Sequence, residues 1–174
     1  MGMAHSRKVV GVLITVSVCL VQCGELALAQ GKTKLLLFTP GEAAQLRMGP
    51  DDSMPPVTRS IPPGPRIVVR EPTVTRTVDG AVIETTPSTR LVIVFEPNRA
   101  PVDMDSLDVR ARKGPFAVSL TSRLKPYVQG TTLQAEGVTV PEGRFVVQIE
   151  IVDRSGAKTV ETYRLDVRAS GHKS

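Results

Sequence analysis

The side chains that most often carry out acid–base, nucleophilic or metal chemistry are scarce in this chain of 174 residues. The two histidines, His5 and His172, lie near opposite ends, and the two cysteines, Cys19 and Cys23, lie close together near the beginning. A histidine-based triad or a zinc site needs several such residues in one place. The sequence also contains no nucleophile-elbow, metalloprotease, phosphate-loop or dinucleotide motif. These patterns favour a protein that is not an enzyme and that needs no cofactor.

Pairs of carboxylates are the remaining candidates for acid–base catalysis. Glu136 with Glu142 and Glu150 with Glu161 are such pairs, but each residue falls on a predicted loop or an outward strand position. We therefore interpret them as solvated surface rather than as a hydrolase site.

Three aspartates, Asp103, Asp105 and Asp108, could gather oxygen ligands for calcium. Asp-x-Asp-Ser before a strand is also ordinary turn chemistry, in which the side chains accept hydrogen bonds from nearby backbone N–H groups. Because the twelve-residue calcium-loop pattern is absent, the turn is the favoured interpretation and weak calcium binding is the alternative.

Basic side chains outnumber acidic ones by 22 to 17 and gather in two clusters. The first surrounds a proline-rich segment and the strands predicted after it, and it consists of Arg59, Arg66, Arg70, Arg76, Arg90 and Arg99. The second surrounds a predicted hairpin and consists of Arg110, Arg112, Lys113, Arg123 and Lys125. Such clusters can meet an anionic surface, although outward strand positions also need charge to protect sheet edges. Aromatic residues make up 3% of the chain and do not interleave with these charges, which argues against nucleic acid as a partner.

Residues 1–29 have the features of a secretory signal peptide, with two basic residues before an apolar stretch at 9–21. That stretch is too short to span a membrane as a helix. An Ala-Leu-Ala sequence predicts cleavage between Ala29 and Gln30, which leaves no transmembrane segment after processing. Lipidation at Cys23 is an alternative, but a glutamine precedes it where lipoprotein signals place a small residue. We expect a periplasmic or secreted protein.

Residues 30–65 are expected to form a flexible, proline-rich segment with a short helix after Thr39. Whether residues 35–47 pack on the following domain stays open. From residue 66 the chain is rich in β-branched residues and has turn signals at short intervals. We predict strands over 66–70, 74–78, 81–85, 90–95, 107–112, 116–120, 132–135, 144–152 and 158–167. Residues 170–174 are expected to be a disordered tail.

Strands with one apolar face each favour a two-sheet antiparallel β-sandwich of about seven to nine short strands, with a small barrel as the alternative. Asp79-Gly80 and Lys113-Gly114-Pro115 predict two tight hairpins. The run 90–95 is almost continuously apolar and should be a central strand, whereas 132–135 should be an edge strand. The expected core is aliphatic and comprises Val68, Leu91, Ile93, Phe95, Val109, Val118, Leu120, Phe145, Val147, Ile149, Ile151, Leu165 and Val167.

Three turn motifs in this region resemble those of Ig-like repeats in bacterial secreted and surface proteins. They are Pro101-Val102-Asp103 with Ser106-Leu107, Pro141-Glu142-Gly143, and Asp153 with Gly156. The resemblance covers residues 66–169. It implies an Ig-like β-sandwich that serves as a spacer, an adhesion module or an accessory that binds carbohydrate or protein. Because the shared motifs shape turns, the resemblance supports the fold rather than a particular activity.

Together these observations lead us to expect an exported, non-enzymatic Ig-like module that binds an envelope protein or an anionic cell-surface polymer. A structural or accessory subunit of an envelope assembly is the alternative. An exported hydrolase with an unrecognised carboxylate site is less favoured.

Overall fold

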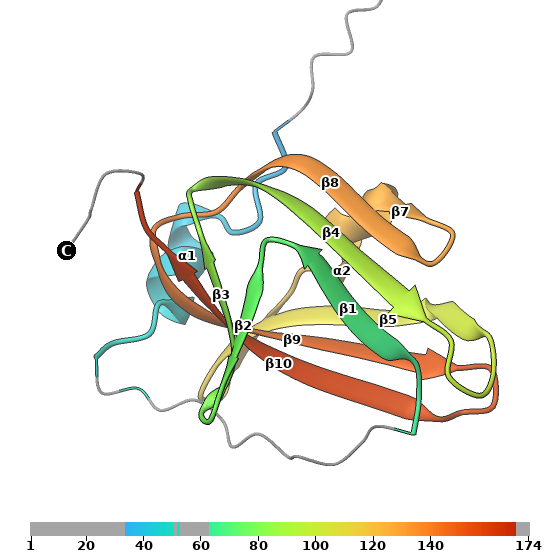
Figure 1. Ribbon diagram of the computed structural model, residues 1–174. Coiled ribbons are helices and arrows are strands. Elements are labelled where there is room, and N and C mark those ends of the chain that lie inside the picture. The colour runs from blue at the N-terminus through green and yellow to red at the C-terminus, as the bar shows by residue number, and fades with distance from the viewer. Residues whose placement is uncertain (1–33, 51, 53–62, 170–174) are drawn as a thin grey trace, which may run out of the picture. The chain divides into compact units, whose positions relative to one another are not determined.

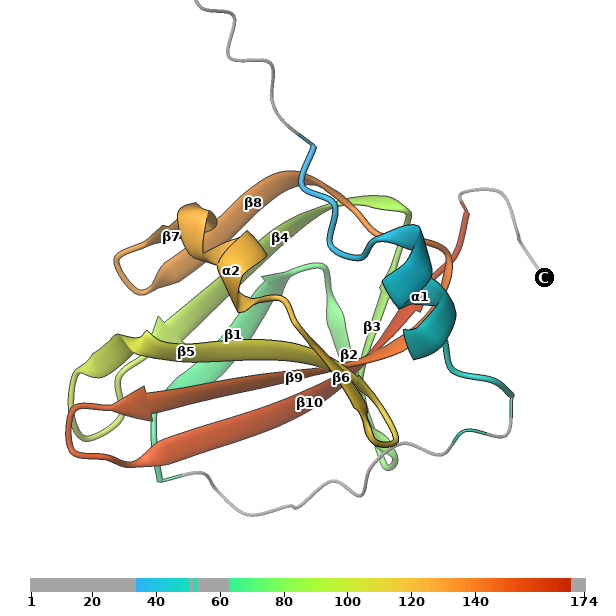
Figure 2. The same cartoon turned by 180° about the vertical axis from the view of Figure 1, so that it is seen from behind.

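The computed structural model describes residues 34–50, 52 and 63–169, which form ten strands, two short α-helices and one 3-10 helix (Figures 1 and 2). The predicted signal peptide, its cleavage point between Ala29 and Gln30, most of the proline-rich segment and the tail 170–174 lie outside these described residues. Within the described part of the chain, no helix combines the length and the apolar character needed to cross a membrane.

The strands form two sheets that enclose a shared apolar core (Figure 1). The first sheet has the order β1 (Arg66–Glu71), β4 (Ser88–Glu96), β8 (Thr132–Thr139) and β7 (Val128–Gln129). The second has the order β2 (Val74–Thr77), β3 (Gly80–Thr85), β10 (Lys158–Val167), β9 (Gly143–Asp153), β5 (Val102–Lys113) and β6 (Phe116–Ser119). The all-β sandwich predicted from the sequence is therefore confirmed.

The order of the strands is that of immunoglobulin-type sandwiches. β1, β4, β8 and β7 take the places of strands A, B, E and D, and β10, β9, β5 and β6 take those of G, F, C and C′. The β2–β3 hairpin lies beside β10, and β3 runs parallel to it. The second sheet is thus mixed, whereas we predicted antiparallel pairing throughout. After β1 the chain crosses from the first sheet to the second, where it forms β2 and β3. It then returns to the first sheet as β4.

Alternation along the strands produces the core, because successive side chains point to opposite faces of a sheet. Most of the predicted core residues are buried, and Leu91, Val118 and Val147 are partly buried against that core. Val68 is the exception. Ile67 is opposite the buried Phe95 of β4 and is itself 3% exposed, so its neighbour Val68 lies on the outward face of β1.

Strands occur at all nine predicted positions, with differences at their ends. β5 begins at Val102 instead of residue 107, and β8 continues to Thr139 and lies between β4 and β7 instead of at an edge. Helix α2 (Thr121–Leu124), the 3-10 helix η1 (Lys125–Tyr127) and the two-residue β7 were not predicted. These elements are too short to show a periodic pattern in the sequence.

The turn motifs behind the family resemblance have clear structural roles. The Ser106 hydroxyl lies at a bulge in β5 and accepts a hydrogen bond from the Val152 N–H at 2.9 Å, which replaces a missing ladder bond. Asp153, at the end of β9, accepts hydrogen bonds from the N–H groups of Ser155 and Ala157, both at 2.9 Å. The Ser155 hydroxyl also donates to Asp153 and is the main cause of a lowered pKa of that carboxyl group. Asp153 therefore closes the β9–β10 turn as a carboxylate.

Residues 34–50 pack onto the sandwich instead of forming a flexible approach to it. The Phe38 ring is fully buried and stacks on Phe145 of β9, with a distance of 4.8 Å between ring centroids. The N–H of Leu37 donates to the Thr139 carbonyl of β8 at 2.9 Å. The question left open by the sequence for residues 35–47 is thus answered, because their apolar side chains complete the core at one end of the sandwich.

Helix α1 (Pro40–Leu46) is held in place by a network around Glu42. The N–H of Thr39 donates to the Glu42 carboxylate, and the N–H of Glu42 donates to the Thr39 hydroxyl, which forms the capping box indicated by the sequence. Arg123 of α2 forms two hydrogen bonds with the same carboxylate, at 2.7 and 2.8 Å. These bonds with Arg123 are the main reason that the pKa of Glu42 is lowered to about 2.

Candidate functional site

The sheet separates one of the two carboxylate pairs considered from the sequence, and Glu161 does not occupy the outward position expected for it. Glu150 belongs to the outward row of β9, whereas Glu161 belongs to the inward row of β10, so the two side chains point to opposite faces of the sheet. Two carboxylates on opposite faces cannot flank one scissile bond. Glu136 of β8 and Glu142 of the turn before β9 are both exposed to solvent.

Each of the three aspartates considered for calcium interacts with a different partner. Asp103 accepts a hydrogen bond from the N–H of Asp105 at 3.2 Å, as expected for a turn. The Asp105 carboxylate is 3.5 Å from the Lys125 ammonium group, and Asp108 forms an ion pair with Arg110. Over residues 34–50, 52 and 63–169, no three His, Cys, Asp or Glu side chains gather as metal ligands. The hydrogen bond between Asp103 and the N–H of Asp105 is the one that the turn interpretation expects.

The second basic cluster serves contacts within the fold. Arg110 pairs with Asp108, and Arg112 donates to the Gln148 side chain. Lys113 donates to the Arg47 carbonyl. Arg123 pairs with Glu42, and Lys125 pairs with Asp105. These contacts join the β5–β6 hairpin and α2 to neighbouring elements, so the cluster has an evident structural role.

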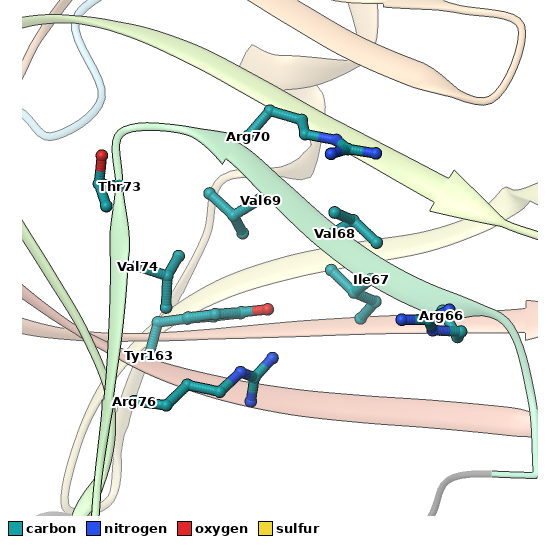
Figure 3. A pocket seen from close by; sticks show the side chains of 9 residues that line it. All are labelled: Arg66, Ile67, Val68, Val69, Arg70, Thr73, Val74, Arg76 and Tyr163. Carbon is teal, nitrogen blue, oxygen red and sulfur yellow. The ribbon is translucent and has the colours of Figure 1, made fainter.

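The first basic cluster borders a groove of about 340 Å³ between β1, β2 and β10 (Figure 3). Arg66 and Arg70 extend from β1, and Arg76 extends from β2 on the other side of the groove. The rest of the lining is mostly apolar and consists of Ile67, Val68, Val69, Thr73, Val74 and Tyr163. The groove therefore combines an aliphatic and aromatic floor with a rim of three guanidinium groups, and no carboxylate is among its nine lining residues.

Arg90 and Arg99, two further members of the first cluster, do not line the groove. Arg90 of β4 is 3.5 Å from the Glu71 carboxylate, and Arg99 is exposed in the loop after β4. Arg59 lies outside the described residues. The structure thus brings together three of the six arginines that the sequence grouped.

The rim arginines form weak ion pairs with carboxylates just outside the groove. Arg66 and Arg70 share the carboxylate of Glu96 on β4, each at 3.6 Å. Arg76 is 3.4 Å from Glu161 on β10. The three arginine side chains are 74%, 61% and 68% exposed, and ion pairs in such surroundings contribute about 0–1 kcal/mol. The guanidinium groups are therefore free to exchange these partners for a ligand.

Tyr163 forms a fixed part of the floor. Its side chain is 1% exposed, and its ring lies beneath β1 in the view of Figure 3. Its hydroxyl donates to the Glu161 carboxylate at 2.6 Å. Burial is the main cause of a strongly raised pKa, so the Tyr163 hydroxyl keeps its proton and donates this bond at neutral pH. This bond holds the Glu161 carboxylate, which lies 3.4 Å from the exposed Arg76 guanidinium group.

The two lateral edges of the sandwich differ. At one edge, α2 and η1 connect β6 to β7 and contact β5 and β8 (Figure 2). At the other edge lie β1 and β2, and the groove opens between them. Within the part of the chain that the structure describes, β1 pairs with β4 alone and β2 with β3 alone. The groove therefore follows a strand whose outer backbone groups are not used in either sheet.

Comparison with known proteins identifies no family for this chain: no protein-family model and no curated protein matches it. Among solved structures, one titled as that of murine CRIg is similar, with a TM-score of 0.33 and 12% sequence identity. The match covers 59% of this chain and 98% of the murine one. The class of protein, a β-sandwich with immunoglobulin-type strand order, follows from the strand pairing described above.

The three rim arginines belong to a cluster of six that is visible in the sequence, whereas the floor of the groove has no such signal. Arg66 and Arg70 are four residues apart on one strand, a spacing that places both on the same face. Tyr163 and Arg76 are far apart in the sequence, and the parallel β3–β10 pairing brings their strands together. That pairing carries no signal in a single sequence, so the combined site could not be predicted.

Proposed function

We propose that the protein is an exported, non-enzymatic Ig-like module of the bacterial envelope that binds an anionic partner through the groove between β1 and β2. The observation that supports this most directly is the set of three guanidinium groups around an apolar floor with no carboxylate in the lining. Binding sites commonly combine an apolar surface with a few convergent polar groups. The predicted signal peptide and the resemblance to bacterial Ig-like repeats support export, and hence an envelope protein or an anionic surface polymer as the partner.

The proposal is tested by retention of envelope components on the immobilised protein. We expect retention that weakens as salt concentration rises, because the interaction depends on exposed charges. Replacing Arg66, Arg70 and Arg76 together with glutamine should abolish it. Arg110→Gln/Arg112→Gln is the matched control, because it removes two outward strand arginines far from the groove. Equal loss in both variants would mean that overall charge, and not the groove, determines binding.

Export is tested separately by the N-terminal sequence of the protein recovered from its native host. A mature chain that begins at Gln30 is expected. A chain that retains the first 29 residues in the cytosol would contradict the proposed location and leave the groove proposal unaffected.

The accessory-subunit alternative is favoured by the free edge of β1, since an unpaired edge strand can complete the sheet of another protein. Gel filtration separates the two possibilities. A soluble monomer when the protein is expressed alone supports the binding module, and aggregation relieved by one specific partner supports the subunit.

A further inference from the structure

We propose that the ligand of the groove is an extended acidic peptide segment of another protein, which joins the first sheet as an additional strand beside β1. This inference rests on the proposed function and specifies the partner and the mode of binding. Four features of β1 support it: its unused backbone groups, its length, its charges and its symmetry.

The first two features concern the backbone. β1 has six residues and would span about 20 Å at the usual rise per residue. It contains no proline, and its central residues Ile67, Val68 and Val69 are all apolar. Such a strand at the edge of a sheet offers a row of N–H and C=O groups to an incoming chain, here over residues 66–69, before the register of β1 shifts between Val69 and Glu71. The groove runs along this edge and provides the space that an added strand needs, because its lining includes consecutive residues from Arg66 to Arg70.

The third feature is the charge on the outward face. Arg66 and Arg70 both approach Glu96, so two cations share one carboxylate and one positive charge remains uncompensated. Arg76 adds a cation from the opposite wall. A neighbouring strand with acidic residues at its two ends would place one carboxylate opposite each β1 arginine, and opposite charges at facing positions stabilise strand pairing.

The fourth feature disfavours one way of pairing with a second copy of this chain. The sequence from Arg66 to Arg70 has an arginine at each end and three aliphatic residues between them. Antiparallel pairing of two β1 strands centred on Val68 would place Arg66 of each copy opposite Arg70 of the other. Like charges at facing positions destabilise this register. An acidic strand in the same place meets no such repulsion.

These features define the peptide. Its first and fifth residues are acidic and face Arg66 and Arg70, and its third residue faces Val68. Its second and fourth residues point inward over Ile67, Val69, Val74 and Tyr163 and are apolar. The floor of the groove thus selects side chains, and the β1 backbone supplies the hydrogen bonds.

The experiment is a selection from a display library of random ten-residue peptides on the purified protein, followed by binding measurements with the enriched peptides. We expect enrichment of two acidic residues four positions apart with apolar residues between them. Arg66→Gln/Arg70→Gln should weaken binding about twofold to thirtyfold, the loss expected for two exposed charge pairs. Arg110→Gln/Arg112→Gln, the matched control, should leave binding unchanged. Enriched peptides without the acidic spacing would overturn the proposal.

Two further measurements test the strand geometry. N-methylation of alternate backbone amides in an enriched peptide keeps its side chains but removes ladder hydrogen bonds. We expect binding to fall at least tenfold for one of the two methylation phases, and the amides of β1 to become protected from hydrogen exchange in the complex with the parent peptide. Unchanged affinity for both phases would overturn strand addition.

A last comparison separates this inference from the proposed function. Polyglutamate and an anionic polysaccharide serve as polymer probes. If they bind in an arginine-dependent way without protecting β1 amides, while no peptide is enriched, the groove binds anions but strand addition is wrong. If neither peptides nor polymers depend on the groove arginines, the proposed function is wrong as well.

Discussion

Replacing Phe38 with alanine tests whether the N-terminal segment is part of the cooperative fold. The Phe38 ring is 0% exposed and stacks on Phe145 at a centroid distance of 4.8 Å. Truncation of a buried phenylalanine costs about 3–5 kcal/mol, through lost burial and the cavity that remains. That is a large part of the roughly 5–15 kcal/mol by which a domain of this kind is stable. We therefore expect a strongly destabilised but still folded sandwich.

Urea unfolding followed by circular dichroism measures the effect. With a dependence of about 1–3 kcal/mol per molar urea, the midpoint should fall by at least about 1 M. Phe116→Ala is the matched control, because Phe116 lies at the tip of the β5–β6 hairpin and is 60% exposed. We expect that variant to stay within about 0.5 kcal/mol of the unsubstituted protein.

If Phe38→Ala changes stability by less than about 1 kcal/mol, the segment does not unfold together with the sandwich. Hydrogen exchange then distinguishes two explanations at Thr139, whose N–H donates to the Leu35 carbonyl at 2.7 Å. Rapid exchange of this amide in the unsubstituted protein would show that the segment detaches on its own, and slow exchange would show that the ring contributes little.

Three further predictions follow from single contacts. Glu42 has a folded pKa of about 2 against an ordinary value of 4.5, so its contribution to stability is complete above pH 4.5 and is lost as the pH falls toward 2. Glu42→Gln should therefore lower stability by about 1–2 kcal/mol at pH 7, with allowance for solvent screening, and by much less near pH 2 in urea titrations. Gly64→Ala should lower the free energy of unfolding by about 1–3 kcal/mol, because a Cβ there would lie 2.5 Å from a backbone oxygen. Gly41→Ala has open space in α1 and should raise the free energy of unfolding by up to about 1 kcal/mol. Thermal unfolding measures both. In a Tyr127→Phe background, phenolate absorbance from Tyr163 should appear at alkaline pH only as the fold is lost, since its raised pKa makes the folded state unstable to ionisation; reversible ionisation with an intact circular dichroism spectrum would contradict this.

The strands were predictable because their local pattern and their tertiary role agree. The run 90–95 is apolar and forms the central β4, and Asp79-Gly80 forms the β2–β3 hairpin. The Val68 error arose because three aliphatic residues in a row give no alternation from which to choose the inward face. The docking of residues 34–50 was not predictable, because it depends on a contact between Phe38 and Phe145, 107 positions later in the chain.

The same long-range contact explains how this sandwich manages without the usual cross-link. Immunoglobulin domains commonly join strands B and F through a disulfide packed against a tryptophan. Here the equivalent strands β4 and β9 carry the fully buried Phe95 and Phe145, and the chain contains no tryptophan. Phe38 stacks on Phe145, so the N-terminal segment adds aromatic packing against the strand that takes the place of F. Among the described residues β1 pairs on one side only, with β4. A strand with one unpaired side is what a binding site built on strand addition requires.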